Sequence, residues 1–509
     1  MNNILTMSKE GKSEYCCNVV QIGTVKPIEG SDFLAETLIN GQSVVVRKDQ
    51  VKEGQLYFYA SNECQLNEKF LSVNNLFEIG SYDLNANFEE VDALLKKAHF
   101  ESDVTKATEY KEQAKKKVGF FSKTGRVRMI RLRKVPSYGF LFGKEEMERY
   151  CPKVASINME EYLNVDFDTV DGELFVKAYV PYSPNRERNG KGRNSKAQKK
   201  IDRFDKIIPG EFMLHYDTKQ LGKCIGMIQP TDILTVTTKV HGTSGIFSNV
   251  KVKNPIKLPL HKWLINKFID ITGLFKSHRF TDYEIVYDSV YSSRTVIKNQ
   301  YINKKADGGY YNTDVWGEYN ELLKGKIEKG MTVYGEIFGY ITNDTKMIQK
   351  DYDYGCAVGT NKFMPYRITS ETDNGKKYEW NVSEVKDWTE KLIDDYPEIK
   401  DRIQVIPILY HGTLQDLYPN LDVHNHWNEN VLEALKNDKE HLGMELLEPM
   451  CKNKVYREGV VVRIDNDPIA ESFKIKSNGF YGYEQKAVDE GTVDMEMELN
   501  YLNEGEENE

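Results

Sequence analysis

Short β-rich runs alternate with turn-forming clusters over the first part of the chain. Runs such as YCCNVVQIGTV, SVVV and LYFYA are separated by PIEGSD, INGQ and KEGQ between Tyr15 and Ala60. Strand-forming residues bounded by Gly, Pro, Asn and Asp are typical of small barrels and sandwiches. A later run from Val127 to Phe142 alternates arginine with apolar residues and predicts one basic strand face. We therefore predict a β module over residues 1–145.

Other stretches have the spacing of helices. Residues 88–118 are predicted to be helical and exposed, and residues 258–275 place tryptophan and leucine at roughly helical spacing, which is typical of a helix covering a core. Two more helices are predicted at 382–396 and 430–450, and β-rich runs surround them. The pattern predicts an α+β fold in which residues 211–485 form a domain of antiparallel sheets flanked by helices.

The length and composition of the chain predict where its domains begin and end. A chain of 509 residues exceeds the roughly 250 to 300 residues that one hydrophobic core serves, so at least two domains are expected. Residues 146–210 are predicted to connect them. Within this segment residues 184–206 are rich in Asn, Gly, Ser and Lys and have no large apolar cluster, which predicts a basic flexible loop. Residues 486–509 are predicted to form an acidic tail.

Charge and targeting signals narrow the class of protein. The net charge of -9 argues against a wholly basic nucleic-acid-binding protein, although Lys and Arg gather between Lys111 and Lys134 and again in residues 186–206. There is no apolar run long enough to span a membrane and no signal-peptide core at the start. The seven cysteines form no CxxC pair, which disfavours a thiolate zinc site or a disulfide framework. We expect a cytoplasmic protein, whether cellular or virus-encoded.

A lysine at the end of a predicted strand is the first candidate for chemistry. In DILTVTTKVHGTSGIFS the β-rich run ends at Lys239 and turns through His241 and Gly242. A lysine delivered by a strand into a glycine-containing turn is well placed to meet a substrate. An ordinary exposed lysine explains the same pattern, because KxxG often occurs by chance.

Four more charged residues lie within otherwise apolar strands. They are Glu336 in VYGEIFGY, Glu458 in YREGVVVRID, and Lys474 and Lys476 in FKIKS. Charged groups in buried strands are costly unless they are paired or bind something charged. Structural ion pairs are one explanation. Three lysines and two glutamates on four strands also suit a pocket for a polyphosphate and its metal.

The ordered series KVHG, GEIFG, EGVVV and FKIK resembles the nucleotidyltransferase motifs of the covalent ligase and capping-enzyme superfamily. The resemblance implies that Lys239 is the nucleophile that becomes adenylated by ATP, and that Glu458 binds Mg²⁺ or Mn²⁺. Most members have Asp where this chain has His241. The His variant, followed by Thr243 and Ser244, is similar to that of RNA ligases.

The resemblance also implies the nucleotide contacts. YSSR resembles the motif whose arginine contacts ribose or phosphate, which implies this role for Arg294, and FMPYRI resembles the motif whose aromatic residue stacks on adenine, which implies this role for Tyr366. Arg367 stands where many relatives have Asp. The complete set of implied nucleotide-binding residues is Thr238, Val240, His241, Gly242, Arg294, Glu336, Tyr366, Lys474 and Lys476.

The N-terminal part completes the resemblance. The runs from Val19 to Tyr59, RLRKVPSYGFLF and LHYDTKQLGK resemble nick-sealing RNA ligases with an OB-like domain ahead of the catalytic one. The chain ends soon after Lys476, leaving no room for a C-terminal OB domain, which disfavours capping enzymes and most DNA ligases. We expect an ATP-dependent RNA ligase that joins 3′-hydroxyl and 5′-phosphate ends of RNA or of RNA-containing duplexes, with nicks as the substrate. The alternatives are a DNA ligase or guanylyltransferase, and a non-catalytic OB-type nucleic-acid-binding protein.

Overall fold

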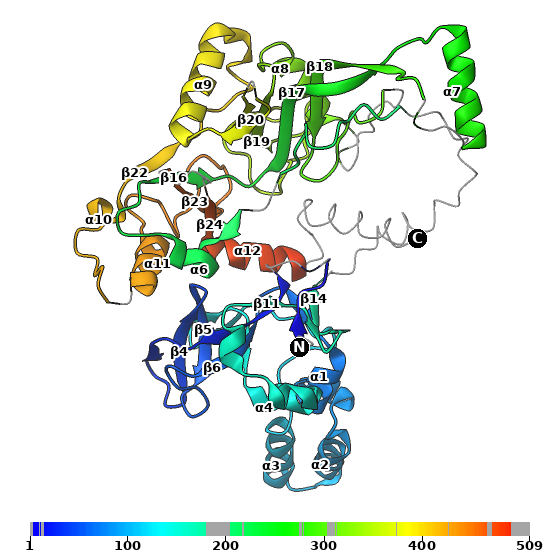
Figure 1. Cartoon of the computed structure of the whole chain (residues 1–509). Helices are drawn as coiled ribbons and strands as arrows, with labels where there is room; N and C mark the ends of the chain where they lie inside the picture. The colour runs from blue at the N-terminus through cyan, green and yellow to red at the C-terminus, as the bar shows by residue number, and fades with distance from the viewer. Residues whose placement is uncertain are drawn as a thin grey trace. The chain divides into compact units, whose positions relative to one another are not determined.

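The computed structural model divides the chain into two compact units (Figure 1). Unit 1 comprises Met1–Pro181 and Gln220–Ile225, and unit 2 comprises Tyr182–Lys219 and Gly226–Glu509. The structure describes residues 4–9, 11, 15–179, 204–215, 218–273, 277, 279–302, 311, 313–372, 374–425, 427–465 and 471–489. The predicted basic loop up to residue 203 and the predicted acidic tail from residue 490 therefore lie outside the described residues.

The strands of unit 1 belong to several small sheets. They are β1 (Leu5–Thr6), β2 (Cys17–Gln21), β3 (Val25–Pro27), β4 (Leu34–Ile39), β5 (Gln42–Arg47), β6 (Leu56–Ala60), β7 (Cys64–Leu66), β8 (Ile130–Leu132), β9 (Val135–Ser137), β10 (Phe140–Phe142), β11 (Asp166–Phe167), β12 (Thr169–Val170), β13 (Glu173–Leu174) and β14 (Val176–Ala178). The sheet orders are β10-β6-β2-β11, β3-β4-β5, β1-β12-β13, β14-β7 and β8-β9. The short strands β10 and β11 end the four-stranded sheet on its two sides, so it has open edges. The described strands form no closed barrel, and the predicted OB-like barrel is not confirmed.

The predicted module boundary at residue 145 falls inside a helix, α4 (Lys144–Tyr150). Strands beyond it pair with strands near the N-terminus, as in the register Asp166↔Asn18 and Val176↔Leu66. Phe167 and Phe175 also share one apolar core with strands β2 and β6. The segment after α4 thus completes unit 1. Its strands are two or three residues long, which is too short for a sequence period to be seen.

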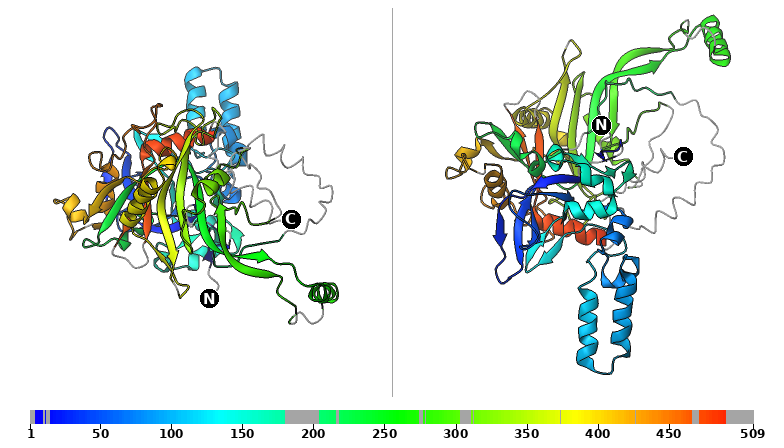
Figure 2. Two further views of the ribbon diagram at one scale, coloured as in Figure 1. Left: turned by 90° about the horizontal axis from the view of Figure 1, so that it is seen from above. Right: turned by 60° about the horizontal axis from the view of Figure 1, so that its bottom comes forward.

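The remaining helices of unit 1 are α1 (Glu68–Val73), η2 (Ile79–Leu84), α2 (Phe88–Phe100), α3 (Val104–Lys115), η3 (Pro152–Ser156), η4 (Met159–Tyr162) and α6 (Leu221–Cys224), with η5 (Ile225–Met227) at the division between the units. Helices α2 and α3 lie side by side as a hairpin (Figure 2), which confirms the predicted helical content of residues 88–118. Asp103 caps the N-terminus of α3, because its carboxylate accepts a hydrogen bond from the backbone N–H of Thr105 at 2.8 Å. Such a side-chain cap satisfies an N–H group that has no partner within the helix.

Unit 2 contains two antiparallel sheets, as predicted. Its strands are β16 (Leu234–Lys239), β17 (Thr243–Pro255), β18 (Tyr283–Ser292), β19 (Met331–Gly339), β20 (Asn361–Glu371), β21 (Lys377–Glu379), β22 (Ile408–Gly412), β23 (Gly459–Ile464) and β24 (Ser472–Lys476), while β15 (Lys219–Gln220) lies at the division between the units. One sheet has the order β18-β17-β19-β20-β21, and the other contains β24-β23-β16-β22. The short turn from β16 to β17 connects the two sheets.

The helices of unit 2 are α7 (Leu260–Thr272), α8 (Val315–Leu323), α9 (Val382–Asp395), η8 (Pro397–Ile399), α10 (Leu414–Leu417), α11 (Trp427–Asn437) and α12 (Asn478–Asp489). The helix predicted at 430–450 ends earlier, at Asn437. The reason is Asp438, whose carboxylate accepts hydrogen bonds from the backbone N–H groups of His441 and Leu442 and turns the chain. None of the helices that the structure describes has the length and apolar character needed to cross a membrane.

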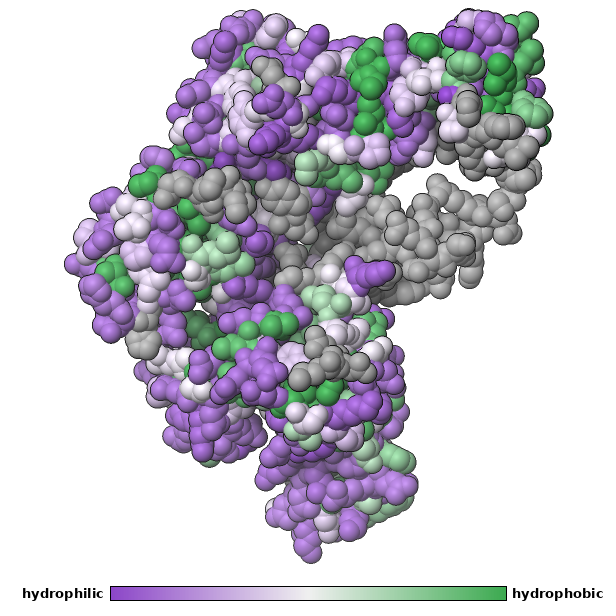
Figure 3. Space-filling model, viewed as in Figure 1, coloured by the Kyte–Doolittle hydropathy of each residue, from purple (hydrophilic) through white to green (hydrophobic). Residues whose placement is uncertain are grey.

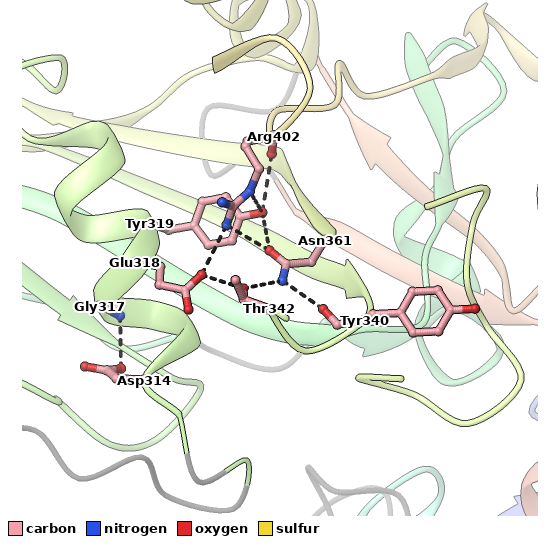
Figure 4. Close-up of polar contacts among 8 residues, drawn as sticks. All are labelled: Asp314, Gly317, Glu318, Tyr319, Tyr340, Thr342, Asn361 and Arg402. Carbon is pink, nitrogen blue, oxygen red and sulfur yellow. Dashed lines mark hydrogen bonds and ion pairs between the residues drawn. The ribbon is translucent and has the colours of Figure 1, made fainter. Parts of the chain in front are cut away.

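A polar network fastens α8 to β20 (Figure 4). The Tyr319 hydroxyl donates to Asn361 Oδ1 at 2.8 Å, and Arg402 Nη2 donates to the same oxygen at 3.0 Å. Arg402 also pairs with Glu318, which accepts a hydrogen bond from Thr342. Asn361 is only 1% exposed, and buried polar groups are costly unless their hydrogen bonds are made. The network therefore stabilises the sheet that carries part of the candidate site.

Candidate active site

Three charged residues meet where neighbouring strands pair. Lys239 at the end of β16 is the register partner of Gly459 at the start of β23, and Gly459 is the partner of Lys476 at the end of β24. Lys239 Nζ lies 2.7 Å from Glu458 Oε1, and Lys476 Nζ lies 4.0 Å from the same oxygen. Strand register thus brings together three of the residues predicted from the motifs.

Glycine permits this close pairing. A Cβ atom at Gly459 would lie 1.9 Å from the carbonyl oxygen of Ile475, and its φ of +145° is one that other residues rarely adopt. The preceding side chain, Glu458, is only 3% exposed. The EG pair of the sequence therefore places a buried carboxylate beside Lys239.

Glu336 joins the cluster from the second sheet. Its Oε1 accepts a hydrogen bond from the backbone N–H of Gly242 at 3.1 Å, just beyond Lys239. A Cβ atom at Gly242 would lie 2.4 Å from the carbonyl oxygen of Ile337, so this turn also requires glycine. Glu336 thereby fixes the turn that carries the lysine.

The side chains on either side of this turn pack into the protein. The His241 imidazole lies edge-on to Tyr352 and Phe480, with ring centroids 5.1 and 5.0 Å away. Val240 is buried in an apolar cluster, and Thr238 is half-buried on β16. The structure gives His241 and Val240 packing roles, so the nucleotide contacts implied for them stay predictions.

Sequence reasoning assigned no role to His215, which lies beside the predicted adenine-stacking residue. Its ring centroid is 6.0 Å from that of Tyr366 and 6.4 Å from that of Tyr334. Burial lowers the pKa of the His215 imidazole to about 3, and four cationic side chains act in the same direction: Arg294, Arg367, Lys239 and Lys474. The imidazole is therefore neutral at physiological pH. The only sequence signal was its place in the run LHYDTKQLGK, which does not reveal a role.

Arg367 forms an ion pair with Glu379 inside the protein. Its Nε lies 2.8 Å from Glu379 Oε2, and its guanidinium lies 4.5 Å from the centre of the Tyr334 ring. Glu379 also pairs with Arg463 at 3.3 Å. This arginine, which departs from the superfamily pattern, is thus part of an ion-pair network beside Tyr366.

The comparisons with known proteins bear on this same region. The RNA ligase family model matches residues 232–476, a stretch that contains Lys239, Glu336, Glu458 and Lys476. Residues 232–476 belong to the RNA ligase family. The match confirms the prediction that the protein is an RNA ligase enzyme. No curated protein matches the chain.

The ligase is also similar to solved structures of an RNA ligase from Naegleria gruberi. The structure with PPi is 16% identical, with a TM-score of 0.48, over 93% of this chain and 99% of that chain. A variant with ATP and Mn is 15% identical, with a TM-score of 0.48, over 92% and 98% of the two chains. The family assignment itself rests on residues 232–476.

The resting charges of the ligase site depend on burial and on the charged groups around Lys239. Burial lowers the pKa of Lys239, but the carboxylates of Glu458 and Glu336 together raise it, so this pKa lies above its usual value. For Glu458, burial raises the pKa, but Lys239, Lys476 and His241 together lower it, with a net decrease. Burial lowers the pKa of Lys476, but Glu484, at 2.7 Å, and Glu458 raise it by more. The resting lysine is therefore an ammonium and not a nucleophile.

The cluster can accept a divalent cation at one point. Glu458 Oε2 is buried and has no hydrogen-bond partner among the described residues. The part of the chain that the structure describes has no group of three or more His, Cys, Asp or Glu residues able to bind a metal alone. Magnesium commonly takes one or two carboxylates and completes its shell with water and substrate phosphates. Glu458 fits such a shared site.

Proposed function

We propose that the ligase joins 3′-hydroxyl and 5′-phosphate ends of RNA through a covalent AMP adduct on Lys239, with ATP as the AMP donor. The observation that carries this proposal is the cluster at the paired strand ends, where Lys239 Nζ lies 2.7 Å from the buried Glu458 and beside Lys476. A lysine amine with a second lysine nearby and a carboxylate that can bind a metal suits attack on a polyphosphate. A non-catalytic binding protein would have no need of this arrangement.

In the first step, the neutral amine of Lys239 attacks the α-phosphorus of ATP. A P–N bond forms, the bond to the bridging oxygen of pyrophosphate breaks, and the attacking nitrogen releases one proton to solvent. A divalent cation bound by Glu458 would supply positive charge at the phosphates and weaken the attraction between this carboxylate and the Lys239 ammonium. Lys474 and Lys476 then stabilise the charge that develops on the leaving pyrophosphate.

Two further transfers complete the reaction. The 5′-phosphate of one RNA end takes AMP from Lys239, and the 3′-hydroxyl of the other end then displaces AMP to form the phosphodiester. We assign Glu336 to the ribose hydroxyls, Tyr366 to the adenine face and Arg294 to a ribose or phosphate oxygen. Neutral His215 beside Tyr366 completes the aromatic side of this pocket.

Unit 1 is the part that we expect to bind the polynucleotide. The hairpin of β8 and β9 and the residues before it display exposed basic side chains: Arg128, Arg131, Arg133 and Lys134. Contacts from lysine and arginine to phosphates provide most of the affinity that does not depend on sequence. We propose that this basic hairpin contacts the duplex beside a nick.

The substrate class is tested with nicked duplexes that differ only in the sugar at the 3′-hydroxyl end. The 2′-hydroxyl distinguishes RNA from DNA, and loss of a hydrogen bond built for it costs roughly 1 to 3 kcal/mol, or about tenfold or more in rate. We therefore expect ribose ends to be sealed at least about tenfold faster. Equal rates would favour the second candidate, a general polynucleotide ligase, with the same adenylation step.

A further inference from the structure

Two strands of unit 2 extend beyond their sheet and carry a helix at their tip. Strand β17 pairs with β19 only over Thr243–Asn249, whereas its pairing with β18 continues to Pro255↔Tyr283. Beyond Asn249 the two strands leave the sheet as an arm, which residues 206 and 207 border near its base through Val252 and Lys253. Helix α7 lies at the far end of this arm (Figure 1). The catalytic Lys239 precedes the opposite end of β17.

Helix α7 exposes its apolar side chains. Six of them are between 43% and 76% exposed: Leu260, Trp263, Leu264, Ile265, Phe268 and Ile271. Figure 3 shows hydrophobic side chains gathered over this helix. Most of them recur every three or four residues, so they share a broad face. Exposed apolar surface of this extent is typical of an interaction site.

The opposite side of α7 contacts the rest of unit 2 through Asn266 and through Ile269, which is 3% exposed. Asn266 is 5% exposed, donates from Nδ2 to the carbonyl oxygen of Phe280 and accepts from the N–H of Phe280, both at 2.8 Å. A helix that covers a core would turn its apolar stripe inward, so the prediction of a core-covering helix at residues 258–275 is wrong. The orientation of α7 leaves the stripe available to a partner.

The charge around this face is positive, although the whole chain carries -9. Residues 256–273 contain three lysines, Lys257, Lys262 and Lys267, and a single carboxylate, Asp270. Asp270 pairs with Arg279 at 3.2 Å, and Arg279 also pairs with Asp282. Arg279 offsets one of these two carboxylates, and the three lysines leave the group of six charged side chains with a net charge of +2.

We propose that α7 is an interfacial helix that lies on a lipid bilayer with anionic headgroups. A helix of 13 residues is about 20 Å long, too short to span a bilayer but long enough to lie in its headgroup plane. Lysines can extend towards anionic headgroups while their stems stay in apolar contact, and tryptophan is favoured at this depth. Lys267 Nζ already lies 4.9 Å from the Trp263 ring centroid.

A bilayer fits this surface better than a protein groove or a second copy of the chain. The apolar surface of α7 is broad, because its six exposed apolar side chains do not lie in one narrow stripe. A groove accepts one narrow helical stripe, whereas a bilayer accepts any convex apolar surface. The positive charge would also repel the same face of a second copy.

The test uses the full chain with phosphatidylcholine vesicles that contain or lack phosphatidylserine. We expect flotation with the anionic vesicles and a blue shift of tryptophan fluorescence that is lost in Trp263→Ser. Phe268→Ser should lower the partition coefficient by about tenfold. About half of the Phe268 side chain is exposed and can enter the bilayer, and serine removes this apolar surface. Phe100→Ser removes an exposed phenylalanine from α2 and is the matched control, which should bind like the wild type.

The outcomes separate the possible partners. Because the substituted side chains are exposed, the variants should keep the wild-type melting temperature and self-adenylation. The proposal is overturned if neither vesicle binds the protein, or if Phe268→Ser binds like the wild type. It is also overturned if light scattering shows a dimer that Phe268→Ser dissociates, since the face would then belong to a second copy.

Discussion

Replacing Glu458 by glutamine should make Lys239 more reactive as an amine while crippling adenylation. The substitution keeps the shape of the side chain and removes the charge that raises the Lys239 pKa above its usual value. In this variant burial and Lys476 still lower the pKa of Lys239, and Glu336 is the carboxylate that still raises it. The pKa of Lys239 should therefore fall.

The structure sets the size of this fall. Opposite charges about 4 Å apart attract by roughly 4 kcal/mol at an effective dielectric constant of about 20, and here the separation is 2.7 Å. The Lys239 side chain is 25% exposed, so solvent weakens the attraction. We expect a decrease of at least about one pKa unit, or about 1.4 kcal/mol. At any pH well below the pKa of Lys239, a decrease of one unit raises the fraction of the neutral Lys239 amine about tenfold.

The assay is acylation of the lysine by acetic anhydride without nucleotide, followed across pH by mass spectrometry of the peptide that contains Lys239. Glu458→Gln should acylate about tenfold faster near pH 8, yet adenylate far more slowly because the proposed cation ligand is lost. Glu484→Gln is the matched control, because Glu484 contacts Lys476 at 2.7 Å and should leave Lys239 acylation near the wild-type rate. Unchanged or slower acylation in Glu458→Gln would refute the reasoning.

Two further predictions concern the charged pocket and the fold. Lys474→Ala and Lys476→Ala should each slow adenylation of Lys239 by about two orders of magnitude or more, since each removes preorganised positive charge; rapid-quench kinetics at wild-type rates would make these lysines structural. Asn361→Ala should lower the free energy of unfolding by about 1 to 3 kcal/mol, because buried partners such as Tyr319 lose a hydrogen bond; an unchanged urea midpoint would show that the network in Figure 4 adds no stability.

The motifs singled out charged residues that the structure brings together. Lys239 and Lys476 each end a strand, Glu458 directly precedes one, and antiparallel pairing joins these positions. The sign of the Lys239 pKa shift was not predictable in this way. It depends on the 2.7 Å contact with Glu458, and a motif contains no distances.

Other features depend on long-range packing. His215 enters the site because the chain before β16 passes beside Tyr366, and no local pattern marks it. The end of unit 1 was missed because strands such as β11 and β12 are too short to show alternation. Helix α7 has the period of a core helix, and its exposed apolar side chains, together with the contact of Asn266 with Phe280, show which side faces outward.

The central claim is that Lys239 carries AMP, and direct mapping of the adduct tests it. The full chain is incubated with α-labelled ATP and Mg²⁺ or Mn²⁺, and the labelled peptide is identified by mass spectrometry. Lys239→Ala and Lys239→Arg, checked for folding by circular dichroism, are treated in parallel. We predict one AMP adduct on Lys239 in the wild type, release of pyrophosphate, and no label in either variant. Label retained in the variants, or no label in the wild type, would contradict the account.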